Sequence, residues 1–264
     1  MKKLTIGLTI LAVILAVFYY GWLVPRYTVP ILMYHSIENK ETGFSVTPEN
    51  FLKQMKFIKD NGYEVISLNE LVGSIKNKKR LERNKVVVTF DDGYKDNLVY
   101  AYPVLRKFNF PATIFLVTGY IGLPFKKGDE REFMNWNDVR LMSERGISFG
   151  GHTRTHYNLG LLNDDGLGFE EIAGSKKIIE EKTGKPADFF CYPGGAFNEK
   201  AKALVIKTGY KGACTTNRGF ASPNSDVYEL KRIKVTNSDT AVPFSFRAKL
   251  SGYYNVFRAE RDPY

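Results

Sequence analysis

Histidine and cysteine are scarce in this chain, whose 264 residues include three histidines and two cysteines. Two cysteines are too few for a cysteine-rich zinc module or a dense disulfide scaffold. Disordered and collagen-like classes are excluded for another reason, because 44% of the residues are apolar and 14% are aromatic, enough to bury a core. Any site built on histidine must draw on His35, His152 and His156.

Charge is also missing from one stretch near the N-terminus. Residues 4–24 carry no charged side chain over 21 positions, which is long enough to cross a bilayer as a helix. A cleavable signal peptide has an apolar region of roughly 7–15 residues that ends in small side chains, whereas this run ends in the largely aromatic segment 18–22. We therefore predict an uncleaved signal anchor, a transmembrane helix at residues 1–24, with cleavage as the alternative.

The basic residues predict the side of the membrane. Lys2 and Lys3 should remain cytoplasmic, which places residues 25–264 outside the cell as the one domain of a single-pass cell-membrane protein. The net charge of +10 becomes +10 − 2 = +8 without the two lysines of the anchor, and this charge suits an anionic envelope surface or lipid headgroups. The basic residues are dispersed, with one short cluster at 76–83, so we expect no nucleic-acid partner. We expect a monomer.

The outer part alternates strand and helix patterns. Apolar, β-rich runs occur at 31–34, 64–67, 86–90, 112–117, 147–150, 189–192, 210–215 and 229–235, and helical patterns occur at 48–61, 97–108, 136–145, 170–183 and 198–208. This alternation predicts an α/β fold with a mainly parallel sheet covered by helices. Seven or eight units favour a distorted (β/α) barrel over an open sheet, and its active site is expected at the carboxyl ends of the strands.

Polar residues follow two of these strands directly. The third run ends in Asp91 and Asp92, whose side chains point in different directions if the backbone is extended, so they can hold different roles; an ordinary turn is the alternative. The fifth run is followed by His152 and His156, and a spacing of four places both imidazoles on one face of a helical turn. Two unrelated surface histidines are the alternative there.

Together these segments offer one aspartate and two histidines to a single divalent metal. Three such ligands leave a position open for catalysis, whereas structural zinc usually has four ligands that include cysteine. The other aspartate is then available as a general base. Zinc is the expected ion, although imidazole and carboxylate ligands also accept cobalt, nickel and manganese.

Two more strand ends are candidates for the same site. His35 follows the first run, which places the third histidine on the same face of the barrel; a structural histidine is the alternative. The sixth run is followed by Pro193, Gly194 and Gly195. This tight turn can present backbone N–H groups to an oxyanion, although an ordinary strand–helix turn has the same composition.

These residues resemble the motifs of the polysaccharide deacetylases, carbohydrate esterase family 4. The sequence Thr-Phe-Asp-Asp-Gly at 89–93 resembles the first motif, which implies Asp91 as general base and Asp92 as metal ligand. The sequence His-Thr-x-x-His resembles the second motif, which implies His152 and His156 as metal ligands. The resemblance extends from about residue 29 to residue 235. It implies hydrolysis of N-acetyl groups on an extracellular or cell-wall amino-sugar polysaccharide, with release of acetate.

The sequence departs from the family's third motif, Arg-x-Pro-Tyr/Phe, whose positions fall at the end of the sixth run. Cys191 stands in place of the arginine and Gly194 in place of the aromatic residue. The N–H of Gly194 can still serve as an oxyanion donor, and Tyr192 and Pro193 of this segment are assigned to substrate binding. Arg232, in the last strand, is grouped with them and is a candidate substitute for the lost arginine.

The family's last motif, Ile/Val-x-Leu-x-His, supplies the general acid near the C-terminus, yet no histidine follows His156. The pattern appears instead at residues 31–35, with Met33 in place of leucine, which implies His35 as the acid. Because the last strand of a barrel neighbours the first, a circularly permuted chain keeps the same site. This order is similar to the poly-β-1,6-N-acetylglucosamine N-deacetylase branch.

Several alternatives stay open. An inactive glycan-binding module with a deacetylase fold would explain the altered third motif. A glycosidase with two carboxylates would leave the histidine pair unexplained. Phe125, Phe133 and Trp136 are candidates to stack on sugar rings or to pack in the core. Cys191 and Cys214 could form a disulfide or remain unpaired.

Overall fold

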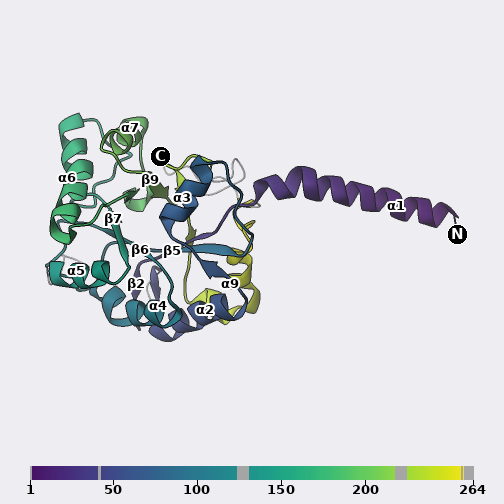
Figure 1. Ribbon diagram of the computed structural model, residues 1–264, viewed down its shortest axis with the longest axis horizontal. Coiled ribbons are helices and arrows are strands. Elements are labelled where there is room, and N and C mark those ends of the chain that lie inside the picture. Colours follow the sequence, from purple (N-terminus) through teal and green to yellow (C-terminus); the bar gives the residue numbers. More distant parts are fainter. Residues whose placement is uncertain (1, 41–42, 124–130, 218–224, 257, 259–264) are drawn as a thin grey trace.

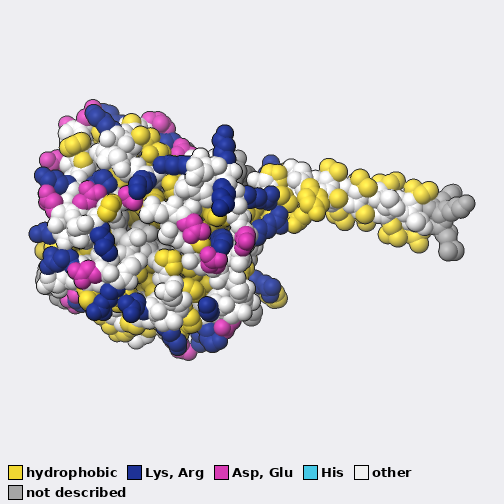
Figure 2. Space-filling model, viewed as in Figure 1, with side chains coloured by type: hydrophobic (Ala, Val, Ile, Leu, Met, Phe, Trp, Pro, Cys, Tyr) yellow, Lys and Arg dark blue, Asp and Glu magenta, His cyan; other side chains and the backbone are white. Residues whose placement is uncertain are grey.

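The computed structural model describes residues 2–40, 43–123, 131–217, 225–256 and 258, and a long N-terminal helix projects from its barrel (Figure 1). The helix α1 (Lys2–Val17) continues through a π-helical segment, η1 (Phe18–Leu23), and a 3-10 turn, η2 (Val24–Arg26). Hydrophobic side chains cover this projection (Figure 2). The segment Leu4–Arg26 has a mean hydropathy of 2.2 and is long and apolar enough to cross a membrane, a property that signal sequences share.

Eight parallel strands of the described residues form a nearly closed barrel. Their order around the sheet is β10 (Leu230–Lys231), β9 (Gly212–Thr215), β8 (Phe189–Cys191), β7 (Ser148–Gly151), β6 (Thr113–Leu116), β5 (Lys85–Phe90), β1 (Ile31–Tyr34) and β11 (Ile233–Lys234). The short strand β4 (Glu64–Val65) also pairs with β5, and β2 (Ser36–Ile37) pairs separately with β3 (Ser45–Val46).

The two ends of this order are consecutive in the chain. β10 pairs with β9, and after a single intervening residue, Arg232, β11 pairs with β1. One extended segment therefore joins the two edges of the sheet. The predicted barrel is confirmed, with two differences. The expected strand at 64–67 is the short β4, which lies outside the barrel order, and the expected last strand at 229–235 is divided into two short strands. Because all eight strands run the same way, the residues that follow them gather at one end of the barrel.

Helices pack around the sheet (Figure 1). They are α2 (Pro48–Asp60), α3 (Leu68–Lys76), η3 (Asn97–Ala101), α4 (Tyr102–Phe108), α5 (Trp136–Glu144), α6 (Asp165–Thr183), η4 (Pro193–Gly195), α7 (Glu199–Lys207), α8 (Ser238–Ala241) and α9 (Pro243–Leu250). Local sequence explains several ends. The side chain of Thr47 accepts a hydrogen bond from the N–H of Asn50, and Pro48 takes the first helical position. Gly184 ends α6 with a φ of 67°, a left-handed cap.

Helix α6 begins earlier than the sequence pattern predicts, at Asp165 instead of residue 170. The glycines at 166 and 168 weaken the helical pattern, because glycine costs about 1 kcal/mol in a helix relative to alanine. Packing explains Gly168, where an added Cβ would lie 2.6 Å from a methyl carbon of Leu204 and 2.7 Å from one of Leu162. Close approach of α6 to its neighbours therefore outweighs helix propensity at this position.

The C-terminal segment packs on the barrel. The rings of Phe246 in α9 and Phe57 in α2 have centroids 5.8 Å apart. Gln54 of α2 donates hydrogen bonds to the carbonyl of Thr236 at 3.2 Å and to the hydroxyl of Thr240 at 2.9 Å. These contacts hold the segment after β11 beside the end of the barrel where the strand ends gather.

Candidate active site

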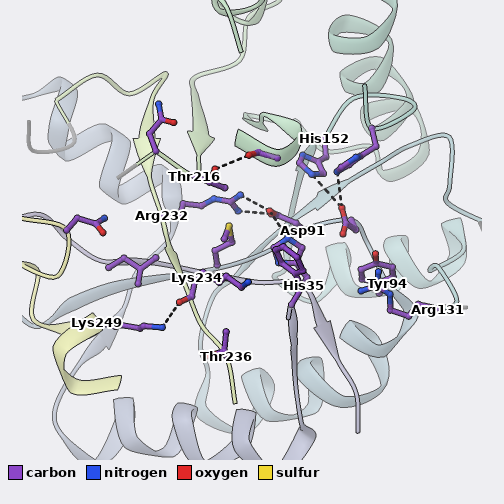
Figure 3. Close-up of a pocket in the computed structure, with 18 of the residues that line it drawn as sticks. His35, Asp91, Tyr94, Arg131, His152, Thr216, Arg232, Lys234, Thr236 and Lys249 are labelled. Carbon is purple, nitrogen blue, oxygen red and sulfur yellow. Dashed lines mark hydrogen bonds and ion pairs between the residues drawn. The ribbon is translucent and has the colours of Figure 1, made fainter. Parts of the chain in front are cut away.

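The predicted site residues meet in a pocket of about 740 Å³ at the carboxyl ends of the strands (Figure 3). Those that line it are His35, Asp91, Asp92, His152, His156, Gly194 and Arg232. They come from the ends of β1, β5, β7, β8 and the β10–β11 segment, so closure of the barrel brings together residues that are far apart in sequence.

Asp92, His152 and His156 form a compact set of metal-ligand atoms. Oδ1 of Asp92 lies 3.6 Å from Nε2 of His152 and 3.6 Å from Nε2 of His156. All three ligand atoms lie within 4.8 Å of one another. One carboxylate oxygen and two imidazole nitrogens at this spacing suit a single divalent ion and leave space for a further ligand.

The two histidines converge through a loop, so the predicted helical turn is wrong. Residues 152–156 form no helix, and Thr153 and His156 have φ values of 62°. Asp92 also has a positive φ, of 72°. Positive φ is uncommon outside glycine and carries a cost, so the fold maintains local strain at the positions where the ligand side chains meet.

Hydrogen bonding prepares the ring of His152 for this role. The side chain is buried, and its Nδ1 lies 2.7 Å from the carbonyl oxygen of Cys191. Because a carbonyl can only accept, Nδ1 carries the proton and donates it, which leaves the lone pair of Nε2 directed toward Asp92. This arrangement is common for histidines that bind metals. The chain therefore fits a metal at this position by its donor set and by the fixed tautomer of a ligand.

A second group, Asp91, His152 and Cys191, also has ligand atoms within 4.8 Å. It fits a metal less well, because both carboxylate oxygens of Asp91 are already bonded to Arg232. Burial raises the pKa of the Cys191 thiol, which opposes the thiolate form that a metal requires. Cys191 lies opposite Cys214 in the β8–β9 register, and both thiols are free in this structure.

Asp91 and Arg232 form a buried, two-bond ion pair. Each terminal nitrogen of Arg232 donates to one oxygen of Asp91 at 2.6 Å, and the two side chains are 0% and 4% exposed. Burial alone would raise the pKa of Asp91, but the charge and hydrogen bonds of Arg232 outweigh it and lower this pKa well below its ordinary value. Asp91 is therefore ionised and fixed in orientation.

Arg232 also lies next to Cys191, the residue that stands where the family motif has its arginine. One of its terminal nitrogens lies 2.9 Å from Sγ of Cys191. That sulfur is in turn 3.8 Å from the carboxylate of Asp91. Arg232 lines the pocket, but its guanidinium is engaged with Asp91, which favours the role of substitute arginine over that of a substrate contact.

His35 lies beside this pair. Its Nε2 is 3.8 Å from Oδ2 of Asp91, and its side chain is 16% exposed (Figure 3). Burial lowers the pKa of His35, although the negative charges of Asp91 and Asp92 oppose this shift. An imidazolium formed at this position is therefore a stronger acid than that of an ordinary histidine.

The turn after β8 is divided between pocket and core. Gly194 is exposed on the pocket lining and has a φ of 62°. Tyr192 is fully buried and stacks on Phe197, with ring centroids 4.2 Å apart, in a core cluster beneath α6 and α7. Pro193 is buried as well. The structure therefore places Tyr192 and Pro193 outside the pocket lining, which argues against their assignment to substrate binding.

Comparison with known proteins decides the family. The sequence profile of the polysaccharide deacetylases matches residues 78–213, just over half of the chain. The chain belongs to the polysaccharide deacetylase family. It is 34% identical over 207 residues to the Bacillus subtilis (strain 168) protein YxkH, whose name places it among the polysaccharide deacetylases, with 78% of this chain and 71% of that protein covered.

This deacetylase also resembles two proteins with more specific names. It is 26% identical over 221 residues to the poly-beta-1,6-N-acetyl-D-glucosamine N-deacetylase of Staphylococcus aureus (strain MRSA252), covering 78% of this chain and 73% of that one. The solved structure of the Streptococcus pyogenes deacetylase PplD, in complex with acetate, has a TM-score of 0.75 and 26% identity to it, covering 84% of this chain and 97% of that one.

Several pocket residues of the deacetylase were missed at the level of sequence. Phe44 lies against His35, with ring centroids 5.0 Å apart, and Tyr94 stacks on Phe133 at 5.1 Å. Of the three aromatic candidates, Phe133 lines the pocket and Trp136 packs against the core, while Phe125 lies outside the described residues. The aromatic residues after the fourth run are visible in the sequence, but the sequence does not distinguish those that line the pocket from those that pack in the core.

Proposed function

We propose that this chain hydrolyses N-acetyl groups on an extracellular or cell-wall amino-sugar polysaccharide and releases acetate. The observation that carries the proposal is the separation of roles at the end of β5. Asp92 joins the two histidines in a metal-ligand set, while Asp91, next to it, is held apart by Arg232 as an ionised carboxylate. The names of the Staphylococcus aureus and Streptococcus pyogenes relatives support the same reaction class.

Each site residue has a separate role in the proposed reaction. Asp92, His152 and His156 would hold one divalent metal, most simply zinc, whose contribution is Lewis-acid polarisation of the acetyl carbonyl. Asp91 removes the proton of the attacking water. The N–H of Gly194 donates to the oxyanion, a contact of a kind that is worth roughly 10²–10³ in turnover elsewhere. His35, as the imidazolium beside Asp91, donates a proton to the leaving amine.

The proposal includes a location. Leu4–Arg26 would anchor the chain in the cell membrane, with the barrel outside. The anchor enters the barrel at the amino end of β1, whereas the pocket lies at the carboxyl ends of the strands. The mouth of the pocket would therefore face away from the membrane, toward the polymers of the envelope.

A glycan-binding module without activity is the second candidate, favoured only by the altered third motif. Such a module has no use for an ionised, oriented carboxylate beside the ligand set, and the Arg232 pair supplies what the motif has lost. A glycosidase would require two carboxylates that flank a sugar bond, whereas here one of the two adjacent aspartates belongs with the histidines.

Acetate release from a panel of glycans tests the proposal directly. We expect the full-length chain, in a neutral detergent, to release acetate from at least one polymer of N-acetylglucosamine or from peptidoglycan, without shortening it. A chelator should abolish the release, and zinc or cobalt should restore it. Shortened chains would indicate a glycosidase, and glycan binding without acetate or shorter chains would indicate an inactive module.

His35→Gln is expected to lower kcat/KM by roughly 10²–10³-fold, because a positioned proton donor contributes this much to many hydrolyses. Glutamine keeps a polar side chain of similar reach but cannot titrate. In the wild type, activity should fall as the pH rises through the pKa of His35, and the variant should lose this alkaline limb. A pH profile of acetate release checks this, and an unchanged alkaline limb would remove His35 from the acid role.

A further inference from the structure

The wall of the pocket beside His35 is basic. Lys234 of β11, Lys249 of α9 and Arg258 line the pocket there, and Figure 3 shows Lys234 and Lys249. Asp239 of α8 pairs with Lys249. These four residues, named here the basic wall, carry a net charge of 3 − 1 = +2. They lie beyond residues 78–213, so the family match does not account for them.

Lys234 is the central residue of the basic wall. It lies two positions after Arg232 in extended backbone, so both side chains point to the same side of the sheet. Arg232 is engaged with Asp91, whereas the ammonium of Lys234 lies 3.8 Å from the centre of the Phe44 ring. Among the described residues, no carboxylate lies within 4 Å of this ammonium.

The surroundings of Lys234 disfavour its charged form. Its pKa is lowered, first by partial burial and then by the neighbouring charge of Lys249. Lys249 is itself nearly buried and donates at 2.6 Å to Asp239 and at 2.7 Å to the carbonyl of Lys234. The carboxylate of Asp239 is further bonded to Thr236 and Ser245. The carboxylate of Asp239 is therefore occupied by hydrogen bonds within the wall. A bound anion would reduce the repulsion between the ammonium groups of Lys234 and Lys249.

The basic wall also lies close to the reacting groups. Phe44 is in contact with both Lys234 and the imidazole of His35. Farther along the wall, the guanidinium of Arg258 lies 4.8 Å from the centre of the Tyr254 ring, and both residues line the pocket. The wall thus combines positive charge with two aromatic faces, which suits a sugar that carries a negative group.

We propose that the deacetylase acts on a sugar chain bearing a carboxylate or phosphate on, or next to, the residue whose acetamide is hydrolysed, and that Lys234 and Arg258 bind this anion. The inference rests on the proposed function for its reaction and adds the charge of the substrate. It places the anion on the side of the pocket where His35 faces the leaving amine.

Matched oligosaccharides test the inference in the full-length chain. Three N-acetylglucosamine oligomers of equal length are compared: one neutral, one with a lactyl carboxylate and one with a phosphate. We expect kcat/KM for acetate release to be at least about tenfold higher for one or both charged oligomers, the value of one good charged contact. Salt should reduce this preference. The charged oligomer that is preferred identifies the source of the anion.

Variants of Lys234 test whether the basic wall causes the preference for charged oligomers. Lys234→Met should lower the charged-to-neutral ratio by about tenfold, and Lys234→Arg should retain most of it. Lys177→Met is the matched control, because Lys177 is 76% exposed on α6, away from the pocket, and its removal changes the charge of the chain by the same amount. A ratio that survives Lys234→Met, or an equal preference for the neutral oligomer in the wild type, would overturn the inference.

Binding separates this inference from the proposed function. Calorimetry on the chelator-treated full-length chain measures the dissociation constant of each oligomer without turnover. Preferential binding of a charged oligomer by the wild type and not by Lys234→Met supports the anion site even if no acetate is ever released. Acetate release from the neutral oligomer, with no binding preference, leaves the deacetylase and removes the anion site.

Discussion

Asp91→Asn is expected to reduce acetate release by about 10³-fold while the affinity for metal stays near that of the wild type. A positioned general base contributes roughly 10²–10⁴-fold in comparable reactions, and asparagine cannot accept the proton of water. The ligand set of Asp92, His152 and His156 does not include Asp91, so the metal should still bind. Acetate release and zinc titration on the same preparation measure the two effects together.

Asp92→Asn is the matched control for this experiment. It makes the same chemical change one residue later, but it removes a metal ligand and leaves the pair of Asp91 and Arg232 intact. We expect it to weaken zinc binding and to lower activity in proportion to the metal lost, so that excess zinc restores part of the rate. Zinc should restore nothing in Asp91→Asn. Near wild-type activity in Asp91→Asn with metal bound would remove Asp91 from the role of base.

The four central residues could be predicted from sequence because each lies within five positions of the end of a strand. Asp91 and Asp92 follow β5, and the two histidines follow β7. Parallel strands that end together leave little freedom in where these side chains can gather. What the sequence did not reveal was the local backbone, since His152 and His156 meet through a strained loop and not along a helix.

The segment around Cys191 shows where sequence reasoning fails. Successive residues of a strand point to opposite faces, and the sequence alone does not reveal which face meets the pocket. Cys191 faces Asp91 and Arg232, so Tyr192 faces the core cluster beneath the outer helices. The sequence predicts a substrate contact for Tyr192 because it lies in the segment that resembles the third motif, whereas the structure places its side chain in the core cluster.

The pair of Asp91 and Arg232 depends on closure of the barrel. Its partners are 141 positions apart, and they meet because the segment from β10 to β11 joins both edges of the sheet. A candidate substitute for the missing arginine could be named from sequence, but the two-bond geometry could not, because it requires the register of a closed barrel. The place of Lys234 in the pocket depends on the same closure, because Lys234 follows Arg232 by two positions in this segment.

Arg232→Met is expected to destabilise the protein by about 3–5 kcal/mol, because it leaves the charge of Asp91 buried without a partner. The sign of the pH dependence follows from the lowered pKa of Asp91. The stability that the pair contributes is present above the unfolded pKa of about 3.9 and is lost as the pH falls through the lower folded pKa. The difference between wild type and variant, measured by denaturant unfolding, should therefore be largest near neutral pH and shrink in acid.

The same substitution should move the acid limb of activity. Without Arg232, burial dominates and the pKa of Asp91 rises, so the base becomes protonated and kcat/KM falls at a higher pH than in the wild type. A merely structural arginine would lower stability without moving this limb. Arg232→Lys keeps one charge but loses the two-bond fork, and we expect it to restore part of the stability and part of the shift.

Cys191→Arg tests whether the arginine has changed its position in the fold. Alone, it would force a second guanidinium beside Arg232, whose terminal nitrogen already lies 2.9 Å from Sγ of Cys191, and we expect loss of stability and activity. In the Arg232→Met background, the same substitution offers Asp91 a new partner from β8 and should raise both stability and kcat/KM above those of Arg232→Met. The double-mutant cycle then has a large favourable coupling between positions 191 and 232. Additive losses would show that Arg232 does more than replace the arginine of the third motif.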